Sequence, residues 1–127
     1  MMKIASGLFI TEYDPSSDVL LVQWPWAESS IPEMQHALDQ VVTTVRHFDI
    51  AHLLLDVRNA ALPAPGQPDP EIMFMEGLKC TRVKKVALVV KDITTRDRQA
   101  RQVGEHTLPY PFQTFIKKEV ALRWLKA

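Results

Sequence analysis

The sequence predicts an α/β protein: an N-terminal antiparallel hairpin followed by βαβαβα, with helices packed on a mixed, mostly parallel sheet. Two β-rich runs flank the turn-forming stretch DPSS at 14–17, which indicates the hairpin. Two continuous apolar runs, HLLLDV at 52–57 and KVALVV at 85–90, are typical of strands that are covered on both faces. Segments with apolar residues at helical spacing separate these strands, so we expect parallel βαβ units.

The hairpin strands are expected at 8–13 and 18–24, because all four residues between them are turn formers. The first helix follows. Ser30 and Glu33 form an S-x-x-E capping box, and the helix ends near His47, where a histidine suits the negative end of the helix dipole. The apolar stripe of this helix consists of Met34, Leu38, Val41, Val42 and Val45.

The second half of the chain continues the alternation of helices and strands. Asp69 and Pro70 are suited to the N-cap and first position of a helix that runs to about Cys80. The remaining expected elements are a helix from Thr94 or Thr95 to Gln102, an edge strand at 113–116 and a closing helix at 117–127. The predicted order is ββαβαβαβα in one domain spanning 1–127, and the proline-rich segment 60–69 is the longest irregular stretch.

Composition excludes several classes of partner and location. Lys plus Arg equals Asp plus Glu at 15 each, so no net charge attracts nucleic acid or an anionic membrane. The single cysteine, Cys80, cannot form an intrachain disulfide, and we expect it to be buried and structural. We find no secretory signal and no apolar run long enough to cross a bilayer. A cytoplasmic protein without membrane insertion is therefore expected.

The residues needed for most enzymatic sites are missing. There is no G-x-S-x-G motif, and the four glycines form no phosphate-binding loop. No two histidines lie four residues apart on one expected helix, so we expect no metal site and no cofactor. A basic patch at Arg96, Arg98 and Arg101 lacks interleaved aromatic residues, which favours a solvated helix over a phosphate-bearing ligand.

The most promising polar residues follow the two buried strands. Because ligands bind open α/β sheets at the carboxyl ends of parallel strands, we expect these residues to form one rim. The candidate ligand- or partner-binding residues are Asp56, Arg58, Asn59, Lys91, Thr94, Thr95 and Arg96. The pattern nevertheless favours a structural role, in which Asp56 accepts hydrogen bonds from nearby backbone N–H groups and pairs with Arg58 or Lys91.

Three aromatic residues lie beside prolines. Trp24 ends an expected strand, so we expect it to be buried. We expect Trp26, and with it Tyr110, at an interface, for which a homodimer is the simplest partner.

The element order and several stretches resemble the STAS-like fold of bacterial anti-sigma-factor antagonists and the related CRAL-TRIO domains. The stretches that carry the resemblance are YDPSSDVLLVQW, LLLDVRN, VALVV followed by TTR, and FIKKEVALRWL. The resemblance implies a small bacterial stand-alone domain, and Asp56 matches the strand-end aspartate of the antagonists. The serine that is phosphorylated in the antagonists has no counterpart, since no serine follows Ser30.

The sequence therefore favours a non-enzymatic STAS-like interaction or regulatory module that binds a protein partner or itself. A small-molecule or lipid-binding domain that uses the rim around Asp56 and Thr94 is the alternative, and it requires a deep apolar pocket. A third hypothesis makes Asp56 a general base, which requires a raised pKa.

Overall fold

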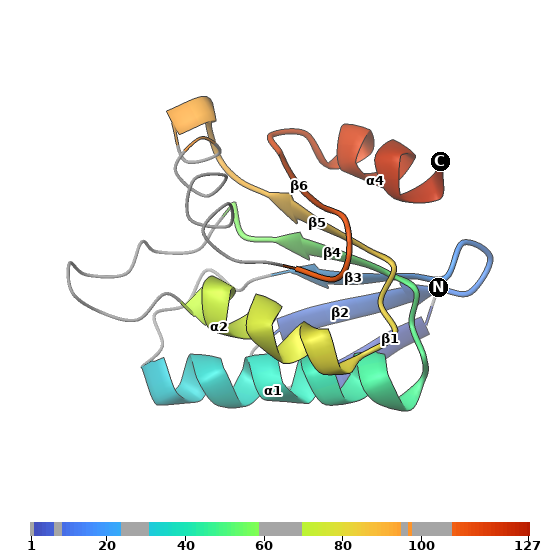
Figure 1. Cartoon of the computed structure of the whole chain (residues 1–127), viewed down its shortest axis with the longest axis vertical. Coiled ribbons are helices and arrows are strands. Elements are labelled where there is room, and N and C mark those ends of the chain that lie inside the picture. The colour runs from blue at the N-terminus through green and yellow to red at the C-terminus, as the bar shows by residue number, and fades with distance from the viewer. Residues whose placement is uncertain (1, 7–8, 24–30, 59–69, 95–96, 98–107) are drawn as a thin grey trace.

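The computed structural model describes residues 2–6, 9–23, 31–58, 70–94, 97 and 108–127. One six-stranded sheet runs through the molecule in the order β1-β2-β3-β4-β5-β6 (Figure 1). The strands are β1 (Met2–Ser6), β2 (Phe9–Asp14), β3 (Val19–Gln23), β4 (His52–Asp56), β5 (Lys85–Val89) and β6 (Phe112–Phe115). The helices are α1 (Ile31–His47), α2 (Pro70–Gly77), the short 3₁₀ helix η1 (Leu78–Cys80) and α4 (Lys118–Lys126).

The mixed sheet confirms the predicted fold class. β1 pairs antiparallel with β2, and β2 pairs antiparallel with β3. The pairs β3–β4, β4–β5 and β5–β6 are all parallel. The connections agree with this pattern, since α1 joins β3 to β4 and α2 with η1 joins β4 to β5.

The predicted hairpin is confirmed as β2 and β3, and a strand that was not predicted extends it to a three-stranded antiparallel meander. β1 (Met2–Ser6) precedes the two predicted strands and pairs with β2 along its whole length. Its sequence, MKIAS, has a lysine and a serine among three apolar residues, so it carries little strand signal by itself. Pairing with β2 supplies the backbone hydrogen bonds that make it a strand.

Two helical layers cover opposite faces of the sheet. α1 and α2 lie on one face, and α4 lies on the other (Figure 1). Side chains alternate between these layers: Leu20 and Val22 of β3 belong to the α1/α2 core, whereas Val19 and Leu21 belong to the α4 core. Full burial of one such leucine stabilises the fold by about 1.5–3 kcal/mol relative to leaving it exposed.

α1 ends where the backbone of Asp49 takes a left-handed conformation, with a φ of 50°. The N–H of Ile50 then donates to the carbonyl of Val45 at 3.1 Å, and the N–H of Asp49 donates to Arg46. This is the Schellman arrangement, which satisfies carbonyls at a helix end. Ile50 is itself buried, so the helix end is fixed to the α1/α2 core.

Two predictions near η1 and β6 were wrong. Cys80 closes η1 with an exposed side chain, because the second helix tightens into a 3₁₀ turn that directs it outward. Tyr110 was expected at an interface, but it is 5% exposed and packs in the α1/α2 core. Its hydroxyl donates to the carbonyl of Met75 at 2.8 Å. An aromatic ring with one satisfied polar atom fits a core as well as an interface.

Three other expectations extend beyond the described residues. Trp24, Trp26 and the whole segment 60–69 are outside the described residues. The expected third helix is described only at residues 93, 94 and 97, which are helical.

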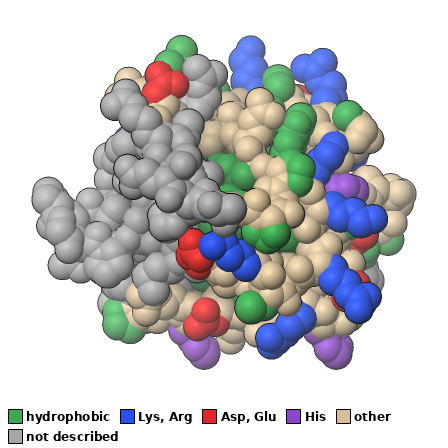
Figure 2. Space-filling view, in the orientation of Figure 1, with side chains coloured by type: hydrophobic (Ala, Val, Ile, Leu, Met, Phe, Trp, Pro, Cys, Tyr) green, Lys and Arg blue, Asp and Glu red, His purple; other side chains and the backbone are tan. Residues whose placement is uncertain are grey.

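The described surface has no large apolar area on the face in Figure 2, where hydrophobic side chains occur in small separate areas. Lys and Arg side chains are spread between them, with Asp and Glu nearby. The large apolar side chains that are most exposed are those of Phe48, Ile93 and Val120. Single exposed apolar residues of this kind are normal on a protein surface.

Candidate functional site

Strand register places the candidate site at the carboxyl ends of the parallel strands. Gln23 of β3 pairs with Asp56 of β4, and Asp56 pairs with Val89 of β5. One residue further, the N–H of Val57 donates to the carbonyl of Val89 at 2.9 Å. The three strand ends are therefore level, so the residues that follow them meet at one rim of the sheet.

The centre of the rim is a close pair between Asp56 and Arg58. Asp56 is 6% exposed, and its carboxylate accepts three hydrogen bonds from Arg58. The backbone N–H and Nε of Arg58 donate to Oδ1 at 3.1 and 3.0 Å, and Nη2 donates to Oδ2 at 2.7 Å. The two-residue separation allows this geometry because the chain leaves β4 at Val57 and turns Arg58 back over the carboxylate.

The Asp56–Arg58 pair determines the pKa of Asp56. Burial raises the pKa of this carboxyl, but the hydrogen bonds and charge of Arg58, together with the charge of Lys118, outweigh burial. The net pKa of Asp56 therefore lies below its ordinary value. The general-base hypothesis requires the opposite shift of the pKa of Asp56, so this direction does not support it.

Arg58 is held in place but still partly open to solvent. The hydrogen bond to Asp56 raises the pKa of the guanidinium, and partial burial opposes this shift. The Arg58 side chain remains 43% exposed. An arginine has five N–H donors, and the contacts to Asp56 use one at Nε and one at Nη2. Three donors are therefore directed away from Asp56.

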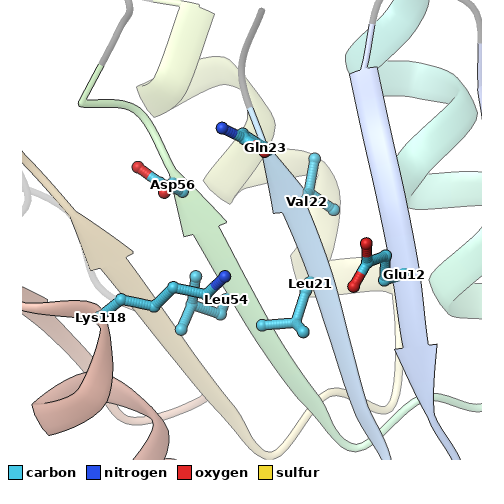
Figure 3. Close-up of a pocket in the computed structure, with 7 residues that line it drawn as sticks. All are labelled: Glu12, Leu21, Val22, Gln23, Leu54, Asp56 and Lys118. Atoms are coloured by element: carbon cyan, nitrogen blue, oxygen red, sulfur yellow. The ribbon is translucent and has the colours of Figure 1, made fainter. Parts of the chain in front are cut away.

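A shallow hollow lies beside the pair on the α4 face of the sheet (Figure 3). The residues that line it are Glu12, Leu21, Val22, Gln23, Leu54, Asp56 and Lys118. The side chain of Lys118 extends from the start of α4 across Leu54, and Glu12 of β2 lies on the opposite side of Leu21. The hollow therefore has an apolar floor and charged groups of both signs around it.

The size of this hollow bears on the small-ligand alternative. It holds about 40 Å³, whereas pockets for drug-sized ligands hold roughly 300–1,000 Å³. A few water molecules fill such a space, and a lipid chain does not fit in it. The hollow is thus not the deep apolar pocket that the small-molecule or lipid-binding alternative requires.

Three residues of the hollow were missed in the sequence: Glu12, Gln23 and Lys118. For two of them, the position along the predicted strands could have indicated a place beside the hollow. Glu12 and Gln23 are polar residues that share a sheet face with Leu21, since Glu12 pairs with Leu21 and Gln23 is two residues along β3. Lys118 gave no signal, because only the packing of α4 on the sheet brings it to β4.

The other predicted rim residues are only partly described. Lys91 and Thr94 follow β5 and are exposed. Asn59, Thr95 and Arg96 lie outside the described residues, as do Arg98 and Arg101 of the basic patch. The structure therefore brings Asp56 and Arg58 together, whereas it shows Lys91 and Thr94 only as exposed residues that follow β5.

The described residues include neither a metal-binding cluster nor a membrane-spanning helix. No group of three or more His, Cys, Asp or Glu side chains in these ranges is arranged to hold a metal ion. None of the described helices has the length and apolar character needed to cross a membrane.

Comparison with known proteins adds one decisive similarity. No protein-family model and no curated protein matches the chain. A crystal structure of an uncharacterised DUF3478-family protein from Shewanella loihica PV-4, described as having a SpoIIAA-like fold, superposes with a TM-score of 0.64. The match covers 96% of this chain and 98% of that one, at 17% identity. The chain has a SpoIIAA-like fold. This result confirms the STAS-like resemblance at the level of the fold, while an identity this low carries no activity across.

Proposed function

We propose that this protein is a non-enzymatic STAS-like interaction module that binds a protein partner at the carboxyl-end rim, with Arg58 as the main contact. The observation that carries the proposal is the way Asp56 holds Arg58. A buried carboxylate fixes one edge of the guanidinium and leaves the rest exposed. An arginine that is already ordered loses less side-chain entropy when it binds, which is why such residues are frequent contact centres.

The chemistry of Arg58 specifies what the partner presents. The three N–H donors directed away from Asp56 suit oxygen acceptors, either a carboxylate or backbone carbonyls. The exposed Lys91 and Thr94 on the next strand end extend this surface with further donors. The partner therefore carries an acceptor-rich segment that lies across the ends of β4 and β5.

The proposal includes no serine phosphorylation switch at this site, because no serine follows Ser30 in the sequence. It does include a regulatory role in a bacterial cytoplasm. The single cysteine and the bacterial source of the similar structure support that location.

The test compares Arg58→Ala with a matched control, Arg123→Ala. Both variants lose one arginine, and Arg123 is exposed on α4 away from the rim. Proteins that immobilised wild-type chain captures from the source cells are identified by mass spectrometry, purified, and titrated against each variant by calorimetry. We expect Arg58→Ala to weaken binding about 30-fold, which corresponds to ~2 kcal/mol at a contact centre, and Arg123→Ala to leave it unchanged.

Thermal unfolding of Arg58→Ala shows whether the variant remains folded, and Arg58→Lys provides a second comparison. Lys keeps the charge but cannot reproduce the two-point contact with Asp56, so we expect only partial recovery of binding. A partner that binds Arg58→Ala as tightly as wild type would contradict the proposal.

A further inference from the structure

The floor of the hollow beside the rim is a row of side chains on three neighbouring strands. Glu12 of β2 pairs in register with Leu21 of β3, and Leu21 pairs with Leu54 of β4. Neighbouring strands lie about 4.8 Å apart, so this row spans roughly 10 Å on the α4 face of the sheet. The side chain of Lys118 crosses Leu54 from the start of α4 (Figure 3). An acidic and a basic side chain therefore lie on opposite sides of a floor made of two leucines.

These two opposite charges are not neutralised by direct contact. Glu12 and Lys118 are both half-buried, and neither head group forms an ion pair or a hydrogen bond with a residue that the structure describes. Asp56 also lines the hollow, but its two oxygens accept the hydrogen bonds of Arg58. The hollow thus has an acceptor at Glu12 and a donor at Lys118, and the electric field between them runs from the lysine to the glutamate.

We propose that the hollow binds a side-chain carboxamide, from an asparagine or a glutamine, of the protein partner. The carboxamide oxygen accepts a hydrogen bond from Nζ of Lys118, and the carboxamide N–H donates to the carboxylate of Glu12. This inference rests on the proposed function, because it names the residue type that the partner places beside Arg58. It adds a second contact whose chemistry differs from that of the arginine.

The charges around the hollow favour a carboxamide over a charged group. A carboxylate that pairs with Lys118 comes close to Glu12 and Asp56, and an ammonium that pairs with Glu12 comes close to Lys118. Each charged group is therefore attracted by one side of the hollow and repelled by the other. A carboxamide has no net charge, and its dipole aligns with the field. Both of its ends then form hydrogen bonds to charged groups, which are stronger than those between neutral groups.

The size of the hollow favours a side chain over the backbone of the partner. Its volume of about 40 Å³ corresponds to about three water molecules, at roughly 10–15 Å³ each. A carboxamide has three heavy atoms, one carbon, one oxygen and one nitrogen, which match this space. A backbone amide also carries a Cα atom on each side and is therefore larger. The apolar floor of Leu21 and Leu54 suits the methylene group that precedes a side-chain carboxamide.

Small probes of similar size test this chemistry without a partner. Propionamide, its isomer N-methylacetamide, propionate and propylammonium are titrated against ¹⁵N-labelled protein, and NMR follows the backbone amides of Glu12, Gln23 and Lys118. We expect propionamide to bind about tenfold more tightly than either charged probe, because a charged probe loses one of the two charge-assisted hydrogen bonds. It should also bind more tightly than N-methylacetamide, whose N-methyl group exceeds the space.

Three results of these titrations overturn the proposal. Binding of a charged probe as tight as that of propionamide assigns the hollow to a charged side chain. Equally tight binding of N-methylacetamide assigns it to the backbone of a partner. The absence of a saturable shift with propionamide leaves the hollow to water alone.

Neutralising the two charges one at a time gives a second readout. Glu12→Gln and Lys118→Met should each weaken propionamide binding about tenfold, because each removes one of the two charges that the carboxamide contacts. Lys126→Met is the matched control for the lysine, since Lys126 is exposed at the end of α4 and does not line the hollow. Circular dichroism confirms that the variants are folded. Propionamide binding that both Glu12→Gln and Lys118→Met leave unchanged overturns the proposal.

The same variants separate this inference from the proposed function. With the partner that the Arg58 experiment identifies, Glu12→Gln and Lys118→Met should each weaken binding about tenfold. Tighter binding of the partner by Lys118→Met indicates a positively charged occupant, and tighter binding by Glu12→Gln indicates a negatively charged one. Either result overturns the carboxamide.

The two proposals can also fail separately. A partner that depends on Arg58 but binds both hollow variants like wild type overturns this inference and leaves the proposed function intact. A partner that is unaffected by Arg58→Ala overturns the proposed function, whereas propionamide binding that depends on Glu12 and Lys118 still supports a carboxamide in the hollow.

Discussion

Asp56 illustrates how one residue can support two opposite hypotheses until its neighbours are known. A carboxylate at the end of a buried strand is compatible with a general base or with a structural ion pair. The structure decides between them, because three hydrogen bonds from Arg58 reach a carboxylate that is only 6% exposed. Stabilisation of the charged form outweighs burial and lowers the pKa.

This lowered pKa predicts a specific pH dependence for Asp56→Asn. A carboxyl with a lower pKa in the folded state stabilises the fold above the pKa of the unfolded chain, about 3.9 for Asp. That stabilisation is lost as the pH falls through the folded-state pKa. We expect Asp56→Asn to reduce the free energy of unfolding by about 1–2 kcal/mol at neutral pH, since the pair is charged but Arg58 is partly exposed.

Urea denaturation of wild type and Asp56→Asn at a series of pH values measures this effect. The difference between them should shrink steadily as the pH falls below about 5 and through the lowered folded-state pKa of Asp56. Asp39→Asn on the exposed face of α1 serves as the control and should show little difference at any pH. A difference between wild type and Asp56→Asn that stays constant through the acid range would exclude the Arg58 pairing as its cause.

At the scale of an element, α4 shows how a short helix is held by a residue from another element. The Nζ of Lys85, in β5, donates to the backbone oxygens of Trp124 and Ala127 at 3.0 and 2.9 Å. It also lies 5.3 Å from the centre of the Trp124 ring. A positive charge at the carboxyl end of a helix opposes the negative end of its dipole and satisfies free carbonyls.

We therefore expect Lys85→Met to destabilise the protein by about 1 kcal/mol, because the aliphatic part remains and the donors are lost. Thermal or urea unfolding measures the change. Lys84→Met is a close control, since Lys84 is the exposed neighbour and its side chain forms no hydrogen bond with a described residue. Equal effects of the two substitutions would show that the contact with the end of α4 contributes nothing.

Some helices and strands could be predicted from local sequence patterns alone. The capping-box motif and the apolar stripe predicted α1 almost to the residue, since the residues of the stripe lie within the helix. Ser30 itself lies outside the described residues. β4 and β5 were equally clear from their apolar runs. β1 was missed because its five residues have no strong pattern, and pairing with β2 is a contact with another segment.

For the molecule as a whole, the two faces of the sheet are unequally covered. The core between the sheet and the α1/α2 layer is larger than the core between the sheet and α4. α4 itself contributes two fully buried residues, Ala121 and Leu125. β4 lies between both layers with four of its five residues buried. Local opening requires less free energy where fewer apolar contacts must be broken.

This asymmetry predicts that α4 opens before the centre of the sheet. In native-state hydrogen exchange we expect the amides of α4 to open at a free energy at least about 2 kcal/mol below that of β4 amides. Lys85→Met should lower the protection of α4 further and change β4 only by the loss of global stability. Equal protection of α4 and β4 would mean that the molecule opens as a single cooperative unit.

The sequence by itself determined the α/β class, the parallel centre of the sheet, its main helices and the absence of the usual catalytic motifs. These features depend on periodicity, caps and residue types, which are local. Tertiary structure alone decided that Tyr110 is buried, that Asp56 has a lowered pKa, and that Glu12, Gln23 and Lys118 share a hollow. Burial and charge coupling depend on segments far apart in the chain, so no local pattern records them.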